Sequence, residues 1–459
     1  MPPNPTLALL LALAACRHSA PADTLPLSSP APLAGPRLTD EQLLDDVQRR
    51  TFRYFWDFAH PQSGMARDRS NVTARQGAEV VATGGSGFGV MAILVAAERG
   101  FVARSEALER LQRITTFLAG GERHHGVFPH WMDGSTGRTI PFGKGDDGGD
   151  VVETAYLVAG LLTARQYFDR PDPGEQSLRA RIDGLWRDVD WTWHLRPGTV
   201  GLMWNRSPTS GFLVDLPVRG WNEALIAYVL AASSPTHPID PVHYHRGWAQ
   251  DGALRNGQEY HGIRLPLGPA YGGPLFFEHY SFLGLDPRGL VDRYADYWEQ
   301  AVNHTLINRE HCVRNPNGWK GYGPHSWGLT ASDVRGGYVG NASPTVDGGT
   351  IAPTAALSSF PFTPEHSMRA LRHFHDDLGG ALLAEWGFRD AFNETEGWVT
   401  DSALAIDQGP IIVMIENHRT GLLWRLFMSC PEVREGLRRL GFTSPHLRGS
   451  PPPDRPTGG

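Results

Sequence analysis

Helical periodicity of the apolar residues constrains this chain more than any other feature of its sequence. One such series runs through the segment that follows Leu38: Leu44, Val47, Thr51, Tyr54, Phe55 and Phe58. The segment that opens at Ser105 repeats the pattern: Leu108, Leu111, Ile114 and Leu118. Spacings of three and four place these side chains on one face of an α-helix. Further helical stretches are predicted to begin near ten other positions: Gly87, Asp150, Glu175, Trp221, Pro241, Gly289, Gly349, Pro364, Ser402 and Thr420.

The segments between these helices are rich in glycine, proline and aromatic residues, as in residues 124–145 and 315–333. No regular succession of alternating strands is present, which argues against a β-sandwich or a β-barrel. Helices joined by alternately short and long loops favour an all-α toroid of paired inner and outer helices. The long loops would gather at one end and form a cleft. Because no sequence repeat of fixed period is found, this prediction rests on the number of helices.

Composition and charge narrow the class of protein. A chain of 459 residues permits two average domains or one large barrel. Hydrophobic residues make up 41% and charged residues 20%, which is typical of a folded protein with a sizeable core. The formal net charge of −7 and the absence of basic clusters argue against a nucleic-acid partner. We expect the protein to be a monomer.

The N-terminus resembles a signal for export. Residues 7–16 form an apolar run that ends in small residues and Cys16, and it is too short to span a membrane. Leu13–Cys16 resembles a bacterial lipobox, in which the cysteine becomes the lipidated first residue. A plain secretory signal is the alternative, since residues 1–6 carry no Lys or Arg. The prediction is an exported, membrane-anchored lipoprotein, periplasmic or at the cell surface, with the lipid as its only membrane contact.

The remaining chain divides simply. Residues 17–37 are rich in Pro, Ala and Ser and are predicted to be a flexible tether. Residues 38–445 would form one catalytic domain, and residues 446–459 a Pro-rich disordered tail. Cys312 and Cys430 lie far apart in sequence, so a disulfide between them is permitted but not established.

Several motifs are excluded by their context. GFGVMA at residues 87–92 mimics a dinucleotide fingerprint, but helices surround it, so its glycines are predicted to serve tight helix packing. DDGGD lacks the spacing of an EF-hand, and no GxSxG elbow is present. No HExxH accompanies the paired histidines, which we interpret as surface or sugar-contacting groups: His124, His125, His243 and His245. Neither a metal nor a cofactor is predicted.

Acidic residues crowd into GDDGGDVVET, residues 145–154. If a helix begins near Gly149, Asp150 and Glu153 share one face of its first turn, and Asp146 approaches that face from the preceding loop. The simplest interpretation is a capped, solvated helix start, because the helix dipole favours negative charge there.

Two further acids lie in unusual surroundings. Glu223, in RGWNEAL, would begin an apolar helix, and Asp407, in IDQGPIIVMIENHRTG, adjoins strongly apolar residues. Carboxyl groups removed from water have a raised pKa and serve as general acids, whereas hydrogen-bonded ones stay ionised. Cleavage of a glycosidic bond requires that division of labour, so these acids favour a carbohydrate enzyme.

Aromatic residues beside glycine, asparagine or histidine suit stacking on sugar faces. The predicted substrate-binding residues combine such aromatics with nearby polar groups: Trp131, Asp133, Trp221, Asn222, Tyr322, Trp327 and Glu416.

A family resemblance adds to these inferences. TIAPTAALSSFPFTPEHSMRAL, EWGFRDAFN and AIDQGPIIVMIENHRTGLLWRLFM resemble the bacterial glycoamylase-like domain of glycoside hydrolase family 144, whose characterised activity is that of an endo-β-1,2-glucanase. GSGFGVMAI, GVFPHWMDGSTG, DDGGDVVETAYLVAGLL and RGWNEAL also resemble that family. Together these segments cover nearly everything from about residue 38 to residue 428.

The resemblance implies an (α/α)₆ barrel that hydrolyses β-1,2-glucan with inversion at the anomeric carbon. By the same resemblance, Glu223 is the general acid, Asp146, Asp150 and Glu153 are cleft acids, and Asp407 is a further cleft acid. The general base stays open between Asp407, which we prefer, and the Asp146/Asp150 pair. Two alternatives remain: a non-catalytic glycan-binding lipoprotein, and a glucoamylase-like hydrolase of another glucan linkage.

Overall fold

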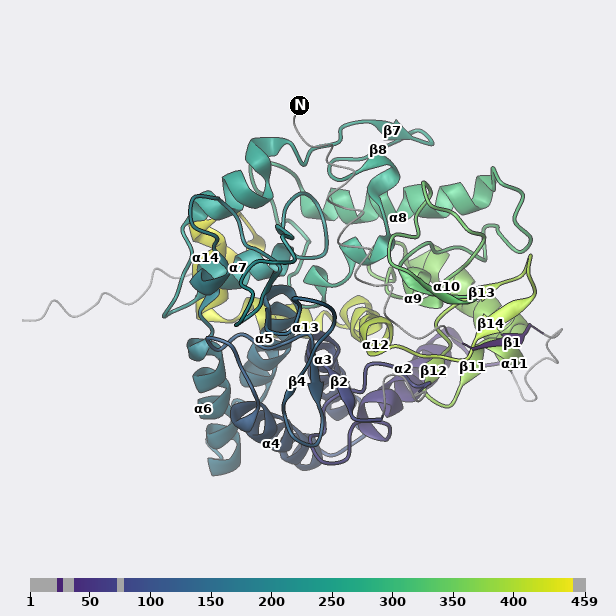
Figure 1. The fold of residues 1–459 in the computed structure, drawn as a ribbon. Coiled ribbons are helices and arrows are strands. Elements are labelled where there is room, and N and C mark those ends of the chain that lie inside the picture. Colours follow the sequence, from purple (N-terminus) through teal and green to yellow (C-terminus); the bar gives the residue numbers. More distant parts are fainter. Residues whose placement is uncertain (1–22, 28–36, 72–77, 449–459) are drawn as a thin grey trace, which may run out of the picture.

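The computed structural model of the chain describes residues 23–27, 37–71 and 78–448 (Figure 1). The predicted signal peptide, Cys16 and most of the predicted tail lie outside these residues. Within them, no helix combines the length and the apolar character needed to cross a membrane.

The helical segments of the barrel form an inner and an outer set, which alternate along most of the chain. The inner segments are α3 (Thr83–Glu98), α5 (Val151–Tyr167), α7 (Leu225–Ser233), η6 (Leu275–Glu278) with η7 (Ser281–Leu283), α9 (Pro353–Leu357) and α12 (Ala405–Arg419). The outer helices are α2 (Asp40–Trp56), α4 (Arg104–Gly120), α6 (Pro173–Asp188), α8 (Tyr297–Arg314), α10 (Pro364–Arg372) and α14 (Pro431–Arg439). Inner helix α3 packs against both α5 and α12, and α5 packs against α7. This arrangement is an (α/α)₆ barrel, as predicted.

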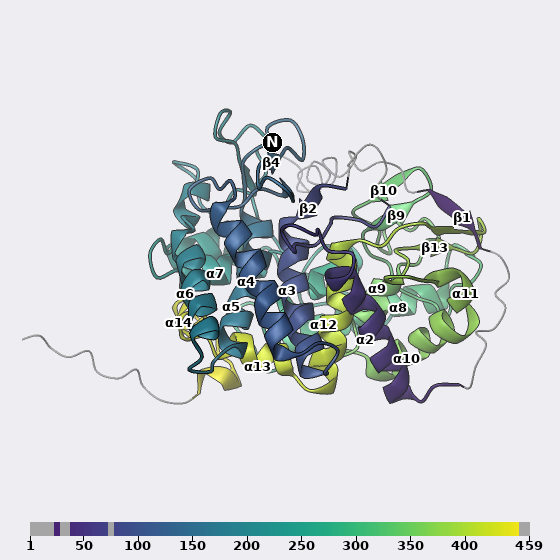
Figure 2. The same ribbon diagram turned by 90° about the horizontal axis from the view of Figure 1, so that it is seen from below.

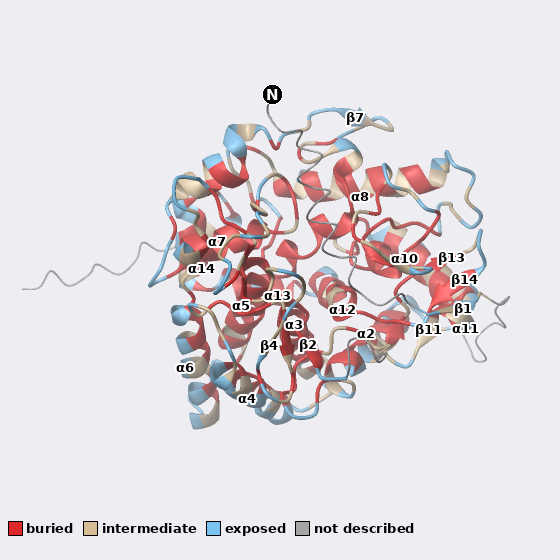
Figure 3. Cartoon of the chain, viewed as in Figure 1, coloured by how far each residue is buried: buried red, intermediate tan, exposed pale blue. Residues whose placement is uncertain are grey.

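The burial of the helices follows their sequences. Helices α3, α5 and α12 carry apolar side chains on nearly every face and are buried on nearly every side. Helices α4 and α6 bury one face only (Figure 3). Helices α3 and α5 meet at Gly87 and Gly160, where a Cβ on either glycine would lie within 2.3 Å of the backbone of the other helix. The glycines of GFGVMA therefore serve helix packing, as predicted.

Shorter helical segments complete the chain: η2 (Trp191–His194), η3 (His243–Trp248), η4 (Gln250–Gly252), η5 (Ala270–Gly272), η8 (His373–Asp377), α11 (Gly379–Leu382), α13 (Leu422–Met428) and η9 (Pro445–Leu447). Several predicted starts are displaced, and α7 and α8 are two examples. Helix α7 begins at Leu225 rather than at Glu223, and α8 begins at Tyr297 rather than near Gly289, because Asp296 caps it. Cys312 and Cys430 are buried and free, so they form no disulfide.

Short antiparallel strands occupy the loops: β1 (Thr24–Pro26), β2 (Val80–Ala82), β3 (Trp131–Asp133), β4 (Thr139–Ile140), β5 (Gly149–Asp150), β6 (Asn205–Arg206), β7 (Glu259–Tyr260), β8 (Ile263–Arg264), β9 (Ser332–Val334), β10 (Gly337–Val339), β11 (Leu383–Ala384), β12 (Gly387–Phe388), β13 (Phe392–Asn393) and β14 (Trp398–Thr400). They pair as β1-β14-β13, β2-β3-β4, β5-β6, β7-β8, β9-β10 and β11-β12. Figure 2 shows β2, β4, β9, β10 and β13 at one end of the barrel, at the top of that view. The long loops thus gather at one end.

One part of the predicted tether belongs to the fold. Strand β1 pairs with β14 in antiparallel register, with Thr24 opposite Thr400. The prediction of a wholly flexible segment over residues 17–37 is wrong at this point, because backbone hydrogen bonds to a sheet edge hold residues 24–26.

Candidate functional site

Asp150 is the N-cap of α5. Its Oδ1 accepts hydrogen bonds from the backbone N–H groups of Val152 and Glu153, both at 3.0 Å, and the side chain is fully buried. The capping interpretation therefore holds for one oxygen. The second oxygen, Oδ2, lies 3.0 Å from His130 Nδ1. A carboxylate that needed only to cap its helix would not require this second, partly exposed partner.

His130 places a positive charge among the acids. Burial alone would lower its pKa, but Glu153, Asp150 and Asp146 outweigh that effect and raise the pKa to about 10. Its ring packs on Phe142, with the ring centroids 4.0 Å apart. The imidazolium thus counters several carboxyl groups that would otherwise repel one another.

Glu153 and Asp146 complete this group. Burial raises the pKa of Glu153 to about 7 although His130 opposes the shift, and its Oε2 accepts a 2.6 Å hydrogen bond from the N–H of Gly84 at the start of α3. Burial and Asp150 likewise raise the pKa of Asp146 to about 7, against His130 and a hydrogen bond with Asn205. The structure brings the three predicted acids together around one histidine.

Glu223 lies in the turn that leads into α7. Its backbone carbonyl accepts a hydrogen bond from Ser281 Oγ at 2.5 Å, and the neighbouring Asn222 caps the turn by accepting from the N–H of Ala224. Burial raises the pKa of Glu223 to about 7, and Asp150 and Glu153 add to the shift while its own backbone N–H opposes it. At neutral pH a large share of this carboxyl is protonated, as a general acid requires.

Asp407 belongs to a second group of carboxyls, at the start of α12. It is 2% exposed, and burial together with the neighbouring Asp390 raises its pKa well above the usual range. Asp390 accepts a 2.6 Å hydrogen bond from the N–H of Asp333, whose carboxyl in turn accepts from Arg69 Nη1 at 3.1 and 3.2 Å. One guanidinium therefore serves a buried cluster of three carboxyls.

Aromatic rings connect the two groups. Tyr156 and Tyr280 lie edge to face with centroids 5.7 Å apart, and both contact Phe88. Besides burial, Glu223 raises the pKa of Tyr156, while Asp407 and Glu223 raise that of Tyr280. Tyr280 thus lies in the electric field of both predicted catalytic acids.

A polar connection runs beside these rings. Asp68 accepts a 3.2 Å hydrogen bond from Trp131 Nε1 and lies 3.5 Å from Arg69 Nε. Trp131, the first residue of β3, directly follows His130 in the chain. A series of polar contacts thus leads from Asp150 through His130, Asp68 and Arg69 toward the group of Asp407. Trp131 itself is 8% exposed and is held at the site by Asp68.

Three predicted substrate-binding residues lie in the core, and those assignments are corrected. Trp221 packs among aromatic rings and donates a 2.8 Å hydrogen bond to the buried Glu278, and Trp327 is fully buried. Glu416 is also fully buried, where it accepts hydrogen bonds from Arg99 and Gln48. All three side chains are covered by other parts of the protein.

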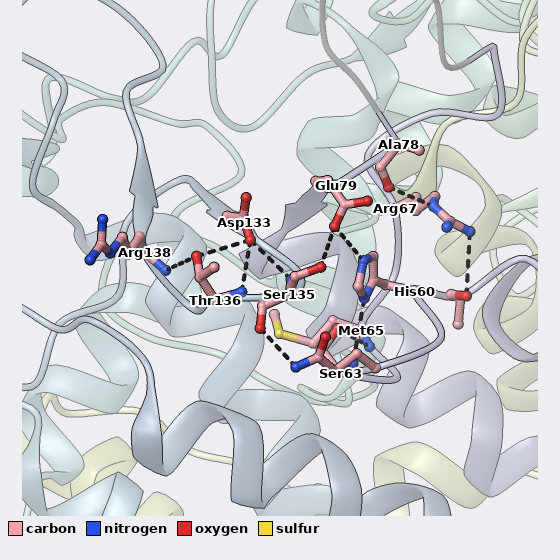
Figure 4. Close-up of polar contacts among 12 residues, drawn as sticks. His60, Ser63, Met65, Arg67, Ala78, Glu79, Asp133, Ser135, Thr136 and Arg138 are labelled. Carbon is pink, nitrogen blue, oxygen red and sulfur yellow. Dashed lines mark hydrogen bonds and ion pairs between the residues drawn. The ribbon is translucent and has the colours of Figure 1, made fainter.

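Two other predicted substrate-binding residues, Asp133 and Tyr322, form hydrogen bonds within their own loops. Asp133 accepts hydrogen bonds from the N–H groups of Ser135 and Thr136 and so caps the turn between β3 and β4 (Figure 4). Tyr322 donates to Asp347 at 2.8 Å and lines a groove of about 1660 Å³ that also includes His418, at the opposite end of α12 from Asp407. Neither residue is placed with the acids.

The sequence did not single out several members of the site: His130, Asn205, Arg69, Asp68, Asp333 and Asp390. Asp333 and Asp390 lie in separate loops, and no spacing relates them to Asp407. His130, in PHWMD, carried the best available signal, because it stands in a Gly/Trp-rich loop beside a chosen tryptophan. Among the residues that the structure describes, no three His, Cys, Asp or Glu side chains are arranged to hold a metal ion.

Comparisons with known proteins identify similar sequences and similar folds. The glycoamylase family model, described as "Putative glucoamylase", matches residues 215–431. A Bacteroides uniformis protein whose structure carries the same description is 55% identical, with a TM-score of 0.87, and the match covers 90% of this chain and all of that one. The endo-β-1,2-glucanase of Chitinophaga pinensis, solved with sophorotriose and glucose, is 51% identical with a TM-score of 0.87, over 90% of this chain and 100% of that one.

A curated relative from Parabacteroides distasonis is an exo-β-1,2-glucooligosaccharide sophorohydrolase that acts at the non-reducing end. It is 45% identical over 423 residues, or 88% of this chain. The match spans 58% of that longer relative.

Proposed function

This chain belongs to the glycoamylase family, and from that membership we propose that it is a glycoside hydrolase that cleaves β-1,2-glucan. One observation in the site supports the proposal most: burial, Asp150 and Glu153 raise the pKa of Glu223 to about 7, and Glu223 and the buried Asp407 both raise the pKa of the same tyrosine, Tyr280. Glycosidic cleavage requires a protonated acid on one side of the bond and a proton acceptor on the other.

In the proposed reaction, Glu223 loses one proton and Asp407 gains one, so the number of protons on the protein does not change. The bond from C1 to the leaving oxygen breaks, and Glu223 gives its proton to that oxygen. A bond forms from C1 to a water oxygen, and Asp407 takes the proton that the water releases. The exchange of these two protons with solvent restores the starting state. Because water attacks the face opposite the leaving group, the anomeric configuration inverts.

His130 and the carboxyls around it are proposed to bind sugar hydroxyl groups. Charged acceptors form strong hydrogen bonds with O–H donors, and a carboxylate held by a cap and a histidine is fixed in orientation. Asp150 has both features, so we assign it to substrate positioning rather than to proton transfer. A non-catalytic glycan-binding lipoprotein, the alternative class, would have no use for a protonated acid at Glu223.

Product length tests the activity and its mode of action. We expect the purified protein to release reducing sugar from linear β-1,2-glucan and to yield a series of oligosaccharides early in the reaction, as an endo-acting enzyme does. The 45% identity to an exo-acting sophorohydrolase supports the second candidate, which would release the disaccharide alone from the first minutes. Chromatography of early products separates the two. If the protein cleaved α-glucans but not β-1,2-glucan, the proposed linkage would be contradicted.

Membrane anchoring is proposed separately, from the lipobox-like Leu13–Cys16. Changing Cys16 to Ser is expected to move the protein from the membrane fraction to the soluble fraction, with the activity of the domain unchanged, because the substituted residue carries no lipid. Fractionation followed by mass spectrometry of the mature N-terminus measures this. A wild-type protein that is wholly soluble and cleaved at another residue would instead favour the plain secretory signal.

A further inference from the structure

Asp390 and Asp407 meet inside the barrel in a way that the proposed reaction does not explain. Each side chain is 2% exposed, and the two carboxyls are in hydrogen-bonding contact. Asp390 Oδ2 is occupied by the N–H of Asp333. The buried oxygens Asp390 Oδ1 and Asp407 Oδ2 receive a hydrogen from no other donor of the described residues.

Two ionised carboxylates cannot face each other in such a place. The charged and titratable groups around the pair are Asp333, Arg69, Asp68, Tyr54 and Tyr280. Arg69 is the only cation among them, and it already contacts Asp333 and Asp68. Burial and Asp333 raise the pKa of Asp390 to about 7, and burial and Asp390 raise that of Asp407 well above its usual range. The pair therefore retains a proton at neutral pH.

Neighbouring groups fix the orientation of both carboxyls. Asp407 is in the first turn of α12, where the helix dipole favours a negative charge. Its backbone is fixed by Thr354 Oγ1, which donates to the carbonyl of Asp407 at 2.9 Å. Asp390 is oriented by the N–H of Asp333, and Asp333 is held by Arg69 and by Ser402 Oγ at 2.6 Å. Both carboxyls are thus fixed. The N–H of Asp333 and the charge of Arg69 favour an ionised Asp390, and the helix dipole together with Arg69 favours an ionised Asp407, so the base role proposed for Asp407 places the shared proton on Asp390.

Building on the function proposed above, we propose that Asp390 is a positioning residue that shares one proton with Asp407 and donates it to Asp407 Oδ2. The hydrogen bond keeps Asp407 ionised and leaves its other oxygen oriented to receive a proton from water. Asp390 itself touches neither water nor sugar in this scheme.

Asparagine at position 390 tests the direction of the hydrogen bond. Its carbonyl accepts from the N–H of Asp333 while its amide donates to Asp407, so Asn reproduces a protonated Asp390. We expect Asp390→Asn to retain activity, with the acid limb of kcat/KM within about half a pH unit of wild type. Leucine is similar in size but donates nothing, so Asp390→Leu is expected to move the acid limb upward by about one pH unit or more. Asp401→Asn, an exposed change nearby, is the control.

If Asp390 were instead an ionised carboxylate, both substitutions would remove a negative charge beside Asp407. Both would then move the acid limb to lower pH, and the proposal would be overturned. A loss of activity in Asp390→Asn at every pH, with the limb unmoved and the fold intact, would also overturn it.

Thermal stability provides a readout that needs no activity. A carboxyl whose folded pKa is raised contributes stability below its unfolded pKa, near 4, and this contribution is lost as the pH rises through about 7. The wild-type Tm should therefore fall more between pH 5 and pH 8 than that of Asp390→Asn. Asp407→Asn should flatten the profile similarly if Asp390→Asn does not fold. Profiles parallel to wild type would overturn the shared proton, even if β-1,2-glucan proved not to be the substrate.

Discussion

Replacing Glu223 by glutamine is expected to leave a folded protein that binds oligosaccharide but turns it over at least about two orders of magnitude more slowly. Glutamine has nearly the same shape, and the contacts of this turn involve the backbone of Glu223 and the side chains of its neighbours. The amide cannot deliver a proton to the leaving oxygen, so only the chemical step suffers. Glu299→Gln, an exposed change in the first turn of α8, serves as the matched control.

The pH dependence of wild type checks the same assignment. A general acid acts in its protonated form, so kcat/KM should fall as the pH rises above about 7, the pKa to which burial, Asp150 and Glu153 raise Glu223. This alkaline limb should be absent from the residual activity of Glu223→Gln. A limb that persists unchanged in the variant would assign the acid to another residue.

The anomer released first provides a further check. An inverting enzyme acting on a β-linked glucan yields the α-anomer before mutarotation, and NMR in the first minutes detects it. Initial release of the β-anomer would mean retention, with a nucleophile about 5 Å from the acid instead of a base at roughly 6.5–9.5 Å. In that case Asp407 could not be acting as a base.

Substituting Asp150 by asparagine is the second change with a large expected effect. Asparagine is as good an N-cap as aspartate, so the hydrogen bonds to Val152 and Glu153 survive and stability should change little. The charge that faces His130 is lost, and the variant presents an N–H to a ring that also donates one. We expect a loss in kcat/KM of roughly two orders of magnitude, through misplacement of the substrate.

Asp172→Asn gives the matched control for this change, because Asp172 caps α6 through the same two types of backbone contact and has no place in the site. Denaturant unfolding and kcat/KM are measured on both variants. If Asp150→Asn cleaves normally and matches Asp172→Asn in stability, Asp150 is only a helix cap. Caps in general contribute about 0.5–2 kcal/mol, which is enough for that comparison to be decided.

Features that depend on residues close together in the sequence could be predicted from the sequence alone. Apolar spacings of three and four located α2 and α4, because a helix places such residues on one face whatever surrounds it. The spacing of Asp150 and Glu153 likewise indicated a shared helix start. Even the error at Glu416 could have been avoided: it lies nine residues after Asp407 in α12, about half a turn around the helix and about 14 Å further along.

Tertiary structure alone decided the rest. The partners of Asp407 come from other segments: α9, α10 and α11 lie between Asp333 and Asp407, and the strands β13 and β14 lie between Asp390 and Asp407, so only tertiary packing brings the three together. Sequence alone does not indicate which tryptophans contact a sugar and which pack in the core. In the structure, Trp221 and Trp327 pack in the core. Protonation states depend on burial and on charges from other elements. Sequence therefore determined the helices and the acids available to them, and the packing of the helices determined which acids hold a proton.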